Sequence, residues 1–194
     1  MDKALVIIPT YNEVENIEII VKKTLERKDF DILVVDDMSP DGTADVVLEL
    51  KKNHNSRLFL EQRAFKEGLG KAYIQGFRWA LKKKYDFIFE MDADLSHDPK
   101  ELSPMLDCLK SEFDLVIGSR YVKGINVVNW PLSRILLSYF ASLYVRGITF
   151  MPIKDPTAGF VGYTREVLEH LDFKRISFVG YAFQIEMKFK IWSK

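Results

Sequence analysis

The feature that most restricts the fold of this chain is a regular alternation of short apolar runs with longer amphipathic stretches. Five runs rich in β-branched and aromatic residues have the length of strands, at residues 4–8, 32–36, 58–61, 87–91 and 115–118. Four stretches between them have helical spacing, at residues 13–27, 43–53, 70–84 and 99–110. Runs that are apolar almost throughout are typical of parallel strands covered on both faces. The alternation predicts an α/β fold with a doubly wound, mainly parallel sheet flanked by helices.

Length, charge and cysteine content limit the classes of function. The 194 residues suffice for one domain with a core. The 28 basic and 28 acidic residues balance, so we expect no nucleic-acid partner. Cys108 is the single cysteine, which argues against a disulfide framework and favours a reducing, cytoplasmic compartment. The first apolar run stops at Pro9, unlike a signal peptide, and the run at residues 135–145 is far short of the roughly 20 residues of a membrane span.

Polar residues follow the predicted strands at the edge where ligands bind in such sheets. Pro9-Thr-Tyr-Asn-Glu13 follows the first strand, Asp36-Asp37 the second, Asp92-Ala-Asp94 the fourth and Ser119-Arg120 the fifth. The first strand has no Gly-x-Gly-x-x-Gly turn after it, and no Walker-type Gly-Lys-Ser/Thr occurs. The absence of both motifs argues against dinucleotide-dependent redox chemistry and P-loop phosphoryl transfer.

Asp92 and Asp94 are the strongest candidates for a metal site. Residues two apart in extended backbone point to the same face, so both carboxylates can converge on one point. Hard oxygen ligands suit Mg²⁺ or Mn²⁺, which binds substrate phosphates as well. A solvated acidic loop is the alternative, but the position after an apolar strand favours the metal site. We leave His97 out of the metal set, because a loop histidine beside acids is more often a hydrogen-bonding neighbour.

Other residues near this edge carry weaker signals. We interpret Asp37 as a nucleotide ligand and Asp41-Gly42 as turn chemistry. Tyr11 could stack on a base, although taken alone packing is the more common role. The loop Gly68-Leu-Gly70 is similar to a phosphate-binding loop, but two glycines also occur at ordinary strand–helix turns. Asn12, with Glu15 three residues later, has the spacing of a capping pair for the first helix.

Six ordered blocks give the chain a family resemblance. In chain order they are Val6-Ile-Ile-Pro-Thr-Tyr-Asn-Glu13, Val34-Val-Asp-Asp-Met-Ser-Pro-Asp-Gly-Thr43, Gly68-Leu-Gly70, Met91-Asp-Ala-Asp-Leu-Ser-His97, Gly118-Ser-Arg-Tyr121 and Gly180-Tyr-Ala-Phe-Gln-Ile-Glu-Met187. From residue 4 to about residue 190 they resemble the dolichol- and polyprenol-phosphate mannose synthases of glycosyltransferase family 2. The resemblance implies an inverting transferase of GT-A fold, a GDP-mannose donor, Mg²⁺ or Mn²⁺, and a polyisoprenyl phosphate acceptor in a membrane.

The resemblance also implies roles for individual residues. Those that resemble the family's nucleotide contacts are Pro9, Tyr11, Glu13, Val35 and Asp37. Asp92, Ala93 and Asp94 resemble its metal–diphosphate site. Arg120, Arg134 and Ser138 resemble phosphate-holding residues, the latter two at the acceptor. Asp92, Asp94, Arg120 and Arg134 are the expected catalytic residues.

Two departures from the family pattern stand out. Ser96 replaces a glutamine that relatives can use near the metal. Family members also continue beyond the position of Lys194 with another strand and a basic loop that clamps the donor diphosphate. We therefore expect residues 1–194 to form a single GT-A catalytic domain that lacks the family's C-terminal segment.

The acceptor phosphate is predicted to need orientation by the protein more than deprotonation by a catalytic base. A phosphate monoester has its second pKa at about 6, so it is mostly dianionic at neutral pH. Arg134 would hold it by bidentate contacts, and we expect no dedicated catalytic base.

The segment 131–147 is predicted to form an amphipathic helix. Its apolar face holds Leu132, Ile135, Leu136, Tyr139 and Leu143, and another face holds Arg134, Ser138, Ala141 and Val145. The helix could lie peripherally on the cytosolic face of a membrane, or it could be an ordinary core helix. Because the phosphate-type arginine lies on this helix, we favour the membrane.

Three other functions stay open. A family 2 transferase could use a UDP-sugar donor or another acceptor. A nucleotidyltransferase also uses carboxylates and a metal, but Pro9-Thr-Tyr-Asn-Glu13 stands in place of its Gly-rich, Arg-containing loop. The chain could also be an inactive nucleotide-sugar-binding domain.

Overall fold

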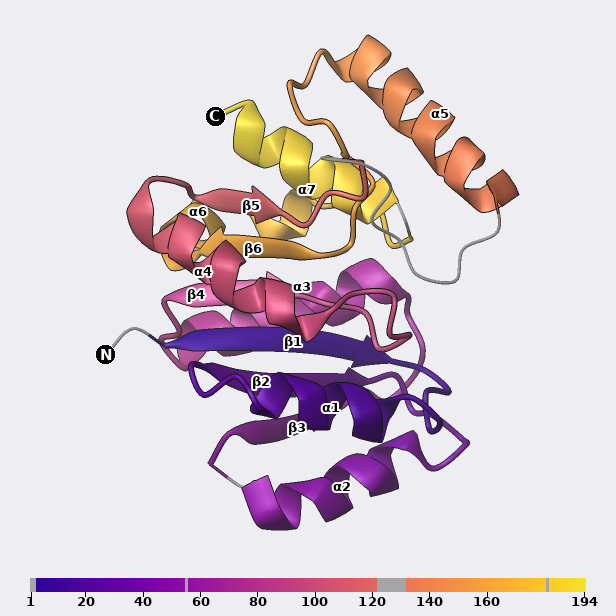
Figure 1. Cartoon of the computed structure of the whole chain (residues 1–194), viewed down its shortest axis with the longest axis vertical. Helices are drawn as coiled ribbons and strands as arrows, with labels where there is room; N and C mark the ends of the chain where they lie inside the picture. Colours follow the sequence, from indigo (N-terminus) through magenta and orange to yellow (C-terminus); the bar gives the residue numbers. More distant parts are fainter. Residues whose placement is uncertain (1–2, 55, 122–131, 181) are drawn as a thin grey trace.

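The computed structural model describes residues 3–54, 56–121, 132–180 and 182–194, except for the side chain of Arg134. One sheet runs through the molecule, with helices on both of its faces (Figure 1). Its strands are β1 (Ala4–Thr10), β2 (Phe30–Asp36), β3 (Leu58–Gln62), β4 (Phe87–Glu90), β5 (Leu115–Ile117) and β6 (Val161–Thr164). The α-helices are α1 (Ile17–Leu25), α2 (Thr43–His54), α3 (Leu69–Lys82), α4 (Leu102–Ser111), α5 (Leu132–Thr149), α6 (Arg165–Glu169) and α7 (Ala182–Trp192). Two short 3₁₀ turns are η1 (Pro99–Glu101) and η2 (Phe173–Arg175).

The strand order is β3-β2-β1-β4-β6-β5. β3, β2, β1 and β4 are parallel, whereas β6 pairs antiparallel with both β4 and β5. The predicted mainly parallel α/β sheet and its five predicted strands are confirmed. The sixth strand, β6, was not predicted. It contains Gly162, where an added Cβ would lie 2.6 Å from the Phe89 ring, and this close approach requires a residue of low strand propensity.

The sheet separates two apolar layers that follow the alternation of each strand. Val6 and Ile8 of β1 face the layer formed with α1, α2 and α4, whereas Leu5 and Ile7 face the layer formed with α3, α6 and α7. All four side chains are fully buried. Burial on both faces explains why these strands are apolar throughout.

The start of α1 differs from the prediction. Asn12 has a φ of 61° and does not cap the helix, which begins at Ile17 after Asn16. The intervening turn is held by the loop after β2, because the Glu13 amide donates to the Thr43 hydroxyl and the Val14 amide to Asp41. These long-range hydrogen bonds outweigh the local capping signal and keep the turn at the edge of the sheet.

Helix α5 lies apart from the sheet, beyond β5 and close to α7 (Figure 1). No helix in the described ranges is both long enough and apolar enough to cross a bilayer.

Candidate functional site

A cavity of about 530 Å³ opens at the carboxyl ends of β1, β2 and β4. It is lined by Pro9, Thr10, Tyr11, Glu13, Asp37, Lys66, Gly68, Leu69, Ala72, Asp92, Ala93, Asp94 and Gly180. Seven of the predicted donor-site residues therefore meet in one cavity, because the parallel strands that precede them end at the same edge. Val35 is the exception among the predicted nucleotide contacts. Its side chain is fully buried in the sheet, so only its backbone could reach a nucleotide.

Asp92 and Asp94 both face this cavity, and each carboxylate is held by a neighbour. Tyr73 of α3, itself fully buried, donates its hydroxyl to Asp92 Oδ1 at 3.1 Å. The Ser96 amide donates to Asp94 Oδ1 at 3.0 Å. His97 lies with Nε2 3.8 Å from Asp92 Oδ2, so the histidine that we left out of the metal set is next to it.

The donor set of this site fits a hard divalent cation that also binds phosphate. No group of three or more histidine, cysteine, aspartate or glutamate side chains placed to hold a metal occurs in the described chain. Asp92 and Asp94 would therefore leave several coordination positions to water and substrate oxygens. Mg²⁺ and Mn²⁺ tolerate that arrangement, whereas structural Zn²⁺ sites need about four protein ligands.

The adjacent residues Asp36 and Asp37 have different roles. Asp36 is fully buried and accepts hydrogen bonds from the Thr10 and Ser39 hydroxyls, which joins β1 to the loop after β2. Asp37 reaches the cavity and pairs with Arg63 at 2.7 Å. Burial raises the pKa of Asp37, and the Arg63 guanidinium opposes part of that shift. Asp36 is therefore a structural carboxylate, whereas Asp37 faces the cavity.

The Asp41-Gly42 turn is also as predicted. Asp41 accepts hydrogen bonds from the Thr43 amide and hydroxyl, and Gly42 has a φ of 89°. Because the Thr43 hydroxyl holds the Glu13 amide, the turn fixes one wall of the cavity.

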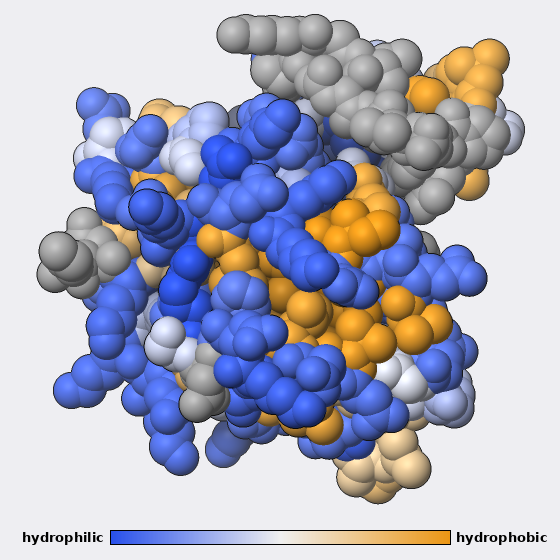
Figure 2. Space-filling view, turned by 60° about the horizontal axis from the view of Figure 1, so that its bottom comes forward, coloured by the Kyte–Doolittle hydropathy of each residue, from blue (hydrophilic) through white to orange (hydrophobic). Residues whose placement is uncertain are grey.

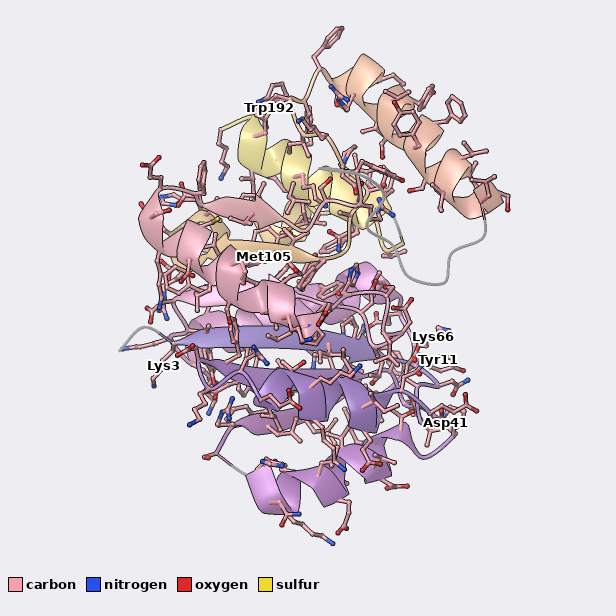
Figure 3. The ribbon with its side chains drawn as sticks, viewed as in Figure 1. Lys3, Tyr11, Asp41, Lys66, Met105 and Trp192 are labelled. Carbon is pink, nitrogen blue, oxygen red and sulfur yellow. The ribbon has the colours of Figure 1, made fainter. Side chains whose placement is uncertain are left out.

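Tyr11 is 38% exposed at the mouth of the cavity rather than packed in the core. Lys66 Nζ lies 3.5 Å from the centroid of its ring. Figure 3 shows Tyr11 and Lys66 next to each other at this edge, opposite Lys3 at the other end of β1. No sequence pattern pointed to Lys66, which belongs to the loop between β3 and α3.

Arg120 lies outside the set of residues that line the cavity. Its guanidinium makes a buried bidentate pair with Asp155, with Nε 2.9 Å from Oδ2, and also donates to the Thr157 hydroxyl. Burial opposes the charge of Arg120, but its hydrogen bonds to the Asp155 carboxylate raise its pKa. Burial likewise disfavours the charged form of Asp155, but its hydrogen bonds from Arg120 lower the pKa of this carboxyl. The predicted donor-phosphate role of Arg120 stays a prediction, and this pair anchors the loops beside the site.

The predicted acceptor residues lie on α5. The side chain of Arg134 is outside the described part of the chain, and Ser138 is half-buried. The Ser138 carbonyl accepts a hydrogen bond from the Ser142 hydroxyl, which is 3.4 Å from the Thr157 hydroxyl. This links the inner side of α5 to the Arg120–Asp155 pair.

A buried polar cluster under the site was not predicted. Glu90 at the end of β4 accepts a hydrogen bond from Gln184 of α7, and Lys188 Nζ lies 2.7 Å from the Ala158 carbonyl oxygen. Burial raises the pKa of Glu90 to about 8 and lowers the pKa of Lys188 to about 8. The loop that Lys188 holds contains Gly159, where an added Cβ would lie 3.2 Å from Asp92 Oδ2. A glutamate at the end of an apolar strand, and a glutamine and a lysine four apart on one helix, were the available signals.

Comparison with known proteins gives consistent matches. The family model described as glycosyl transferase family 2 matches residues 5–172. A polyprenol monophosphomannose synthase of Mycolicibacterium smegmatis is 47% identical over 189 residues, which are 97% of this chain and 71% of that protein. An undecaprenyl-phosphate mannosyltransferase of Micrococcus luteus is 42% identical over 189 residues, 97% of this chain and 77% of that protein.

The fold is similar to that of a mannosyltransferase from Pyrobaculum calidifontis, solved in complex with GDP-mannose and Mn²⁺. The TM-score is 0.58 at 22% sequence identity, and the match covers 86% of this chain. The chain spans 46% of that protein, so this likeness bears on the fold alone.

Proposed function

The chain belongs to glycosyl transferase family 2, as its motifs predicted, and we propose that it transfers mannose from GDP-mannose to a polyisoprenyl phosphate with inversion at the sugar carbon. Its sheet has the GT-A fold of such transferases. The observation that carries the proposal is the cavity, where the ends of β1, β2 and β4 bring Tyr11, Asp37, Asp92 and Asp94 together. The relatives named as polyprenol and undecaprenyl phosphate mannosyltransferases support the choice of sugar and acceptor.

In this proposal different residues of the cavity wall contact different parts of the donor. Tyr11 offers an exposed ring for the base, and Asp37 offers a carboxylate for the nucleoside. Asp92 and Asp94 would hold Mg²⁺ or Mn²⁺, which neutralises the charge on a departing diphosphate. Tyr73 and the Ser96 amide keep these two carboxylates in place.

The acceptor phosphate would be oriented by Arg134 and Ser138 on α5. A planar guanidinium fixes two phosphate oxygens at once and so sets the line of attack. Since the phosphate is already anionic at neutral pH, no side chain has to remove a proton from it.

The exposed surface of α5 supports peripheral contact with a membrane. Leu136, Leu137, Phe140 and Tyr144 are 48%, 73%, 62% and 70% exposed, whereas Ser142 is buried. Figure 2 shows apolar side chains at the end of the molecule where α5 lies. A helix on a core has the opposite arrangement, with its apolar face inward. This exposure supports an interfacial helix near the acceptor site over the core-helix alternative for α5.

Metal-dependent donor binding is the decisive test. The Asp92→Asn/Asp94→Asn double variant should lose at least about 10²-fold in Mn²⁺-dependent GDP affinity, because it removes both carboxylate charges. Calorimetry with GDP, UDP and dTDP, each with and without Mn²⁺, measures this and ranks the bases. Asp107→Asn, on the exposed side of α4, is the matched control and should bind as the parent protein does.

Two results would contradict the proposal. Undiminished Mn²⁺-dependent GDP affinity in a folded double variant would show that Asp92 and Asp94 do not hold the metal. Preference for UDP over GDP in the parent protein would replace the guanine donor with a uridine one.

A further inference from the structure

Lys66 is the one cationic side chain among the described residues that line the donor cavity. The other charged lining residues are Glu13, Asp37, Asp92 and Asp94, all of them acidic. The ammonium group of Lys66 lies over the Tyr11 ring, 3.5 Å from its centroid. The ammonium group thus lies against an aromatic ring, at a wall otherwise rich in carboxylates.

The charges of this wall oppose the binding of a nucleoside diphosphate. Asp37 is paired with Arg63, which leaves Glu13, Asp92 and Asp94 facing an anionic ligand. One divalent cation offsets only part of the combined negative charge of three carboxylates and a diphosphate. Arg120, whose guanidinium is engaged by Asp155, lies outside the lining. A further mobile cation at the cavity would remove much of the remaining repulsion.

We infer that Lys66 is a donor-phosphate ligand that leaves the Tyr11 ring for the diphosphate when the nucleotide binds. This inference rests on the proposed function, because it assigns a cation to the nucleotide of that same cavity. An ammonium group 3.5 Å from the ring centroid occupies one face of Tyr11, so a base stacked on that face requires Lys66 to move. A charge-assisted bond to phosphate is stronger than an exposed cation–π contact, which gives the movement its direction.

The loop that carries Lys66 is anchored at the end that joins α3. It joins β3 to α3 and ends at Gly68, which has a φ of 97° and directly precedes the first residue of α3. An added Cβ on Gly68 would lie 3.1 Å from the Val179 carbonyl oxygen, so the end of the loop is held closely against residue 179. Lys66 itself is exposed on a long side chain. The backbone is thereby anchored at one end while the ammonium group is free to change partner.

The test compares ligands that contain a diphosphate with one that lacks it. Calorimetry in Mn²⁺ would measure GDP, inorganic pyrophosphate and guanosine on the parent protein, Lys66→Met, Lys66→Arg and Lys71→Met. Lys66→Met should weaken GDP and pyrophosphate on the order of tenfold, because one charge-assisted contact to phosphate is lost. Guanosine affinity should stay unchanged or rise slightly, since the ring face of Tyr11 is then open. Lys66→Arg should restore most of the diphosphate affinity.

Lys71→Met is the matched control, because Lys71 is a nearby exposed lysine that pairs with Glu67 and does not line the cavity. Equal GDP affinity in the parent protein and Lys66→Met would overturn the inference while leaving the donor proposal intact. Equal losses for guanosine and GDP would also overturn it. If the parent protein binds pyrophosphate in a Lys66-dependent way but binds neither GDP nor UDP, the inference holds and the proposed donor falls. If no ligand binds at all, both are wrong.

Discussion

The donor cavity and helix α5 differ in whether the fold itself provides partners for their side chains. Asp36, Asp37 and Asp92 each accept a hydrogen bond from a distant part of the chain, and Asp94 accepts one from the Ser96 amide in its own loop. On α5, by contrast, large apolar side chains face outward and the buried position is a serine, Ser142. The carboxylates are thus in place before a ligand arrives, whereas α5 leaves its large apolar side chains exposed, as the proposed membrane contact requires.

This difference indicates two kinds of binding. A preorganised polar site needs little rearrangement to receive metal and diphosphate, so its residues should act mainly on donor affinity. An apolar helix face lowers its free energy by leaving water, so its residues should act mainly on association with lipid. Variants in one region should therefore leave the function of the other nearly unchanged, and the following experiments test that separation.

The largest effect is expected from Arg134→Lys. We expect transfer to a polyprenyl phosphate to fall on the order of 10²-fold, because a lysine ammonium fixes the phosphate less rigidly than a guanidinium. GDP affinity should stay within about twofold, since positioning of the acceptor does not contribute to donor binding. Steady-state transfer from GDP-mannose and calorimetry with GDP measure the two quantities.

Arg146→Lys, an exposed position on the same helix, controls for a general effect of the substitution on α5. Equal losses of donor binding and transfer in Arg134→Lys would place this arginine at the donor instead. Unaltered transfer would make it an ordinary surface residue of α5.

A smaller effect is expected on membrane binding when Leu136 and Tyr139 are both replaced by glutamate. These side chains are 48% and 45% exposed, and their contact with the apolar interface would be lost together with about 2 kcal/mol. That corresponds to a reduction on the order of 30-fold in partition to vesicles of anionic and neutral phospholipid. Liposome flotation measures it, and calorimetry should show unchanged GDP affinity.

The matched control replaces Leu48 and Ile19, which are 46% and 43% exposed on α2 and α1. The same flotation in both double variants would show that apolar exposure on α5 has no special role in membrane contact. Loss of flotation in the control alone would move the contact surface to the opposite part of the molecule.

The sequence predicted most of the donor cavity because topology alone brings its residues together. Asp37 and Asp92 each follow a parallel strand, and parallel strands that begin at one edge must end at the other. The sequence did not predict Lys66, Tyr73 or Lys188. Lys66 reaches Tyr11 from a loop whose path no local pattern sets, and Tyr73 reaches Asp92 across a helix–sheet interface.

The acceptor side was less accessible to prediction for a different reason. Helical periodicity predicted α5 but could not say which face is inward, because burial against a core and contact with a membrane produce the same apolar spacing. The structure resolves this through Ser142, which is 2% exposed beside Thr157, and through Leu137, which is 73% exposed.

The smallest effect is expected from Tyr73→Phe, which tests whether the donor cavity is preorganised. Tyr73 is fully buried, and its hydroxyl donates to Asp92 Oδ1 at 3.1 Å. Removal of this hydroxyl leaves the packing of the ring intact but frees the carboxylate to turn. Groups that orient metal ligands typically contribute about 10-fold or more to metal affinity. We therefore expect Mn²⁺-dependent GDP affinity to fall on the order of tenfold, with GDP affinity in the absence of metal unchanged.

Tyr163→Phe is the matched control, since Tyr163 is equally buried but makes no hydrogen bond to Asp92 within the described residues. Equal Mn²⁺ dependence in Tyr73→Phe and the parent protein would show that Asp92 needs no such support, and the contrast with α5 would lose its basis. A loss that Tyr163→Phe shares would indicate a general loosening of the sheet under the site, which the urea midpoint of unfolding would register in both variants.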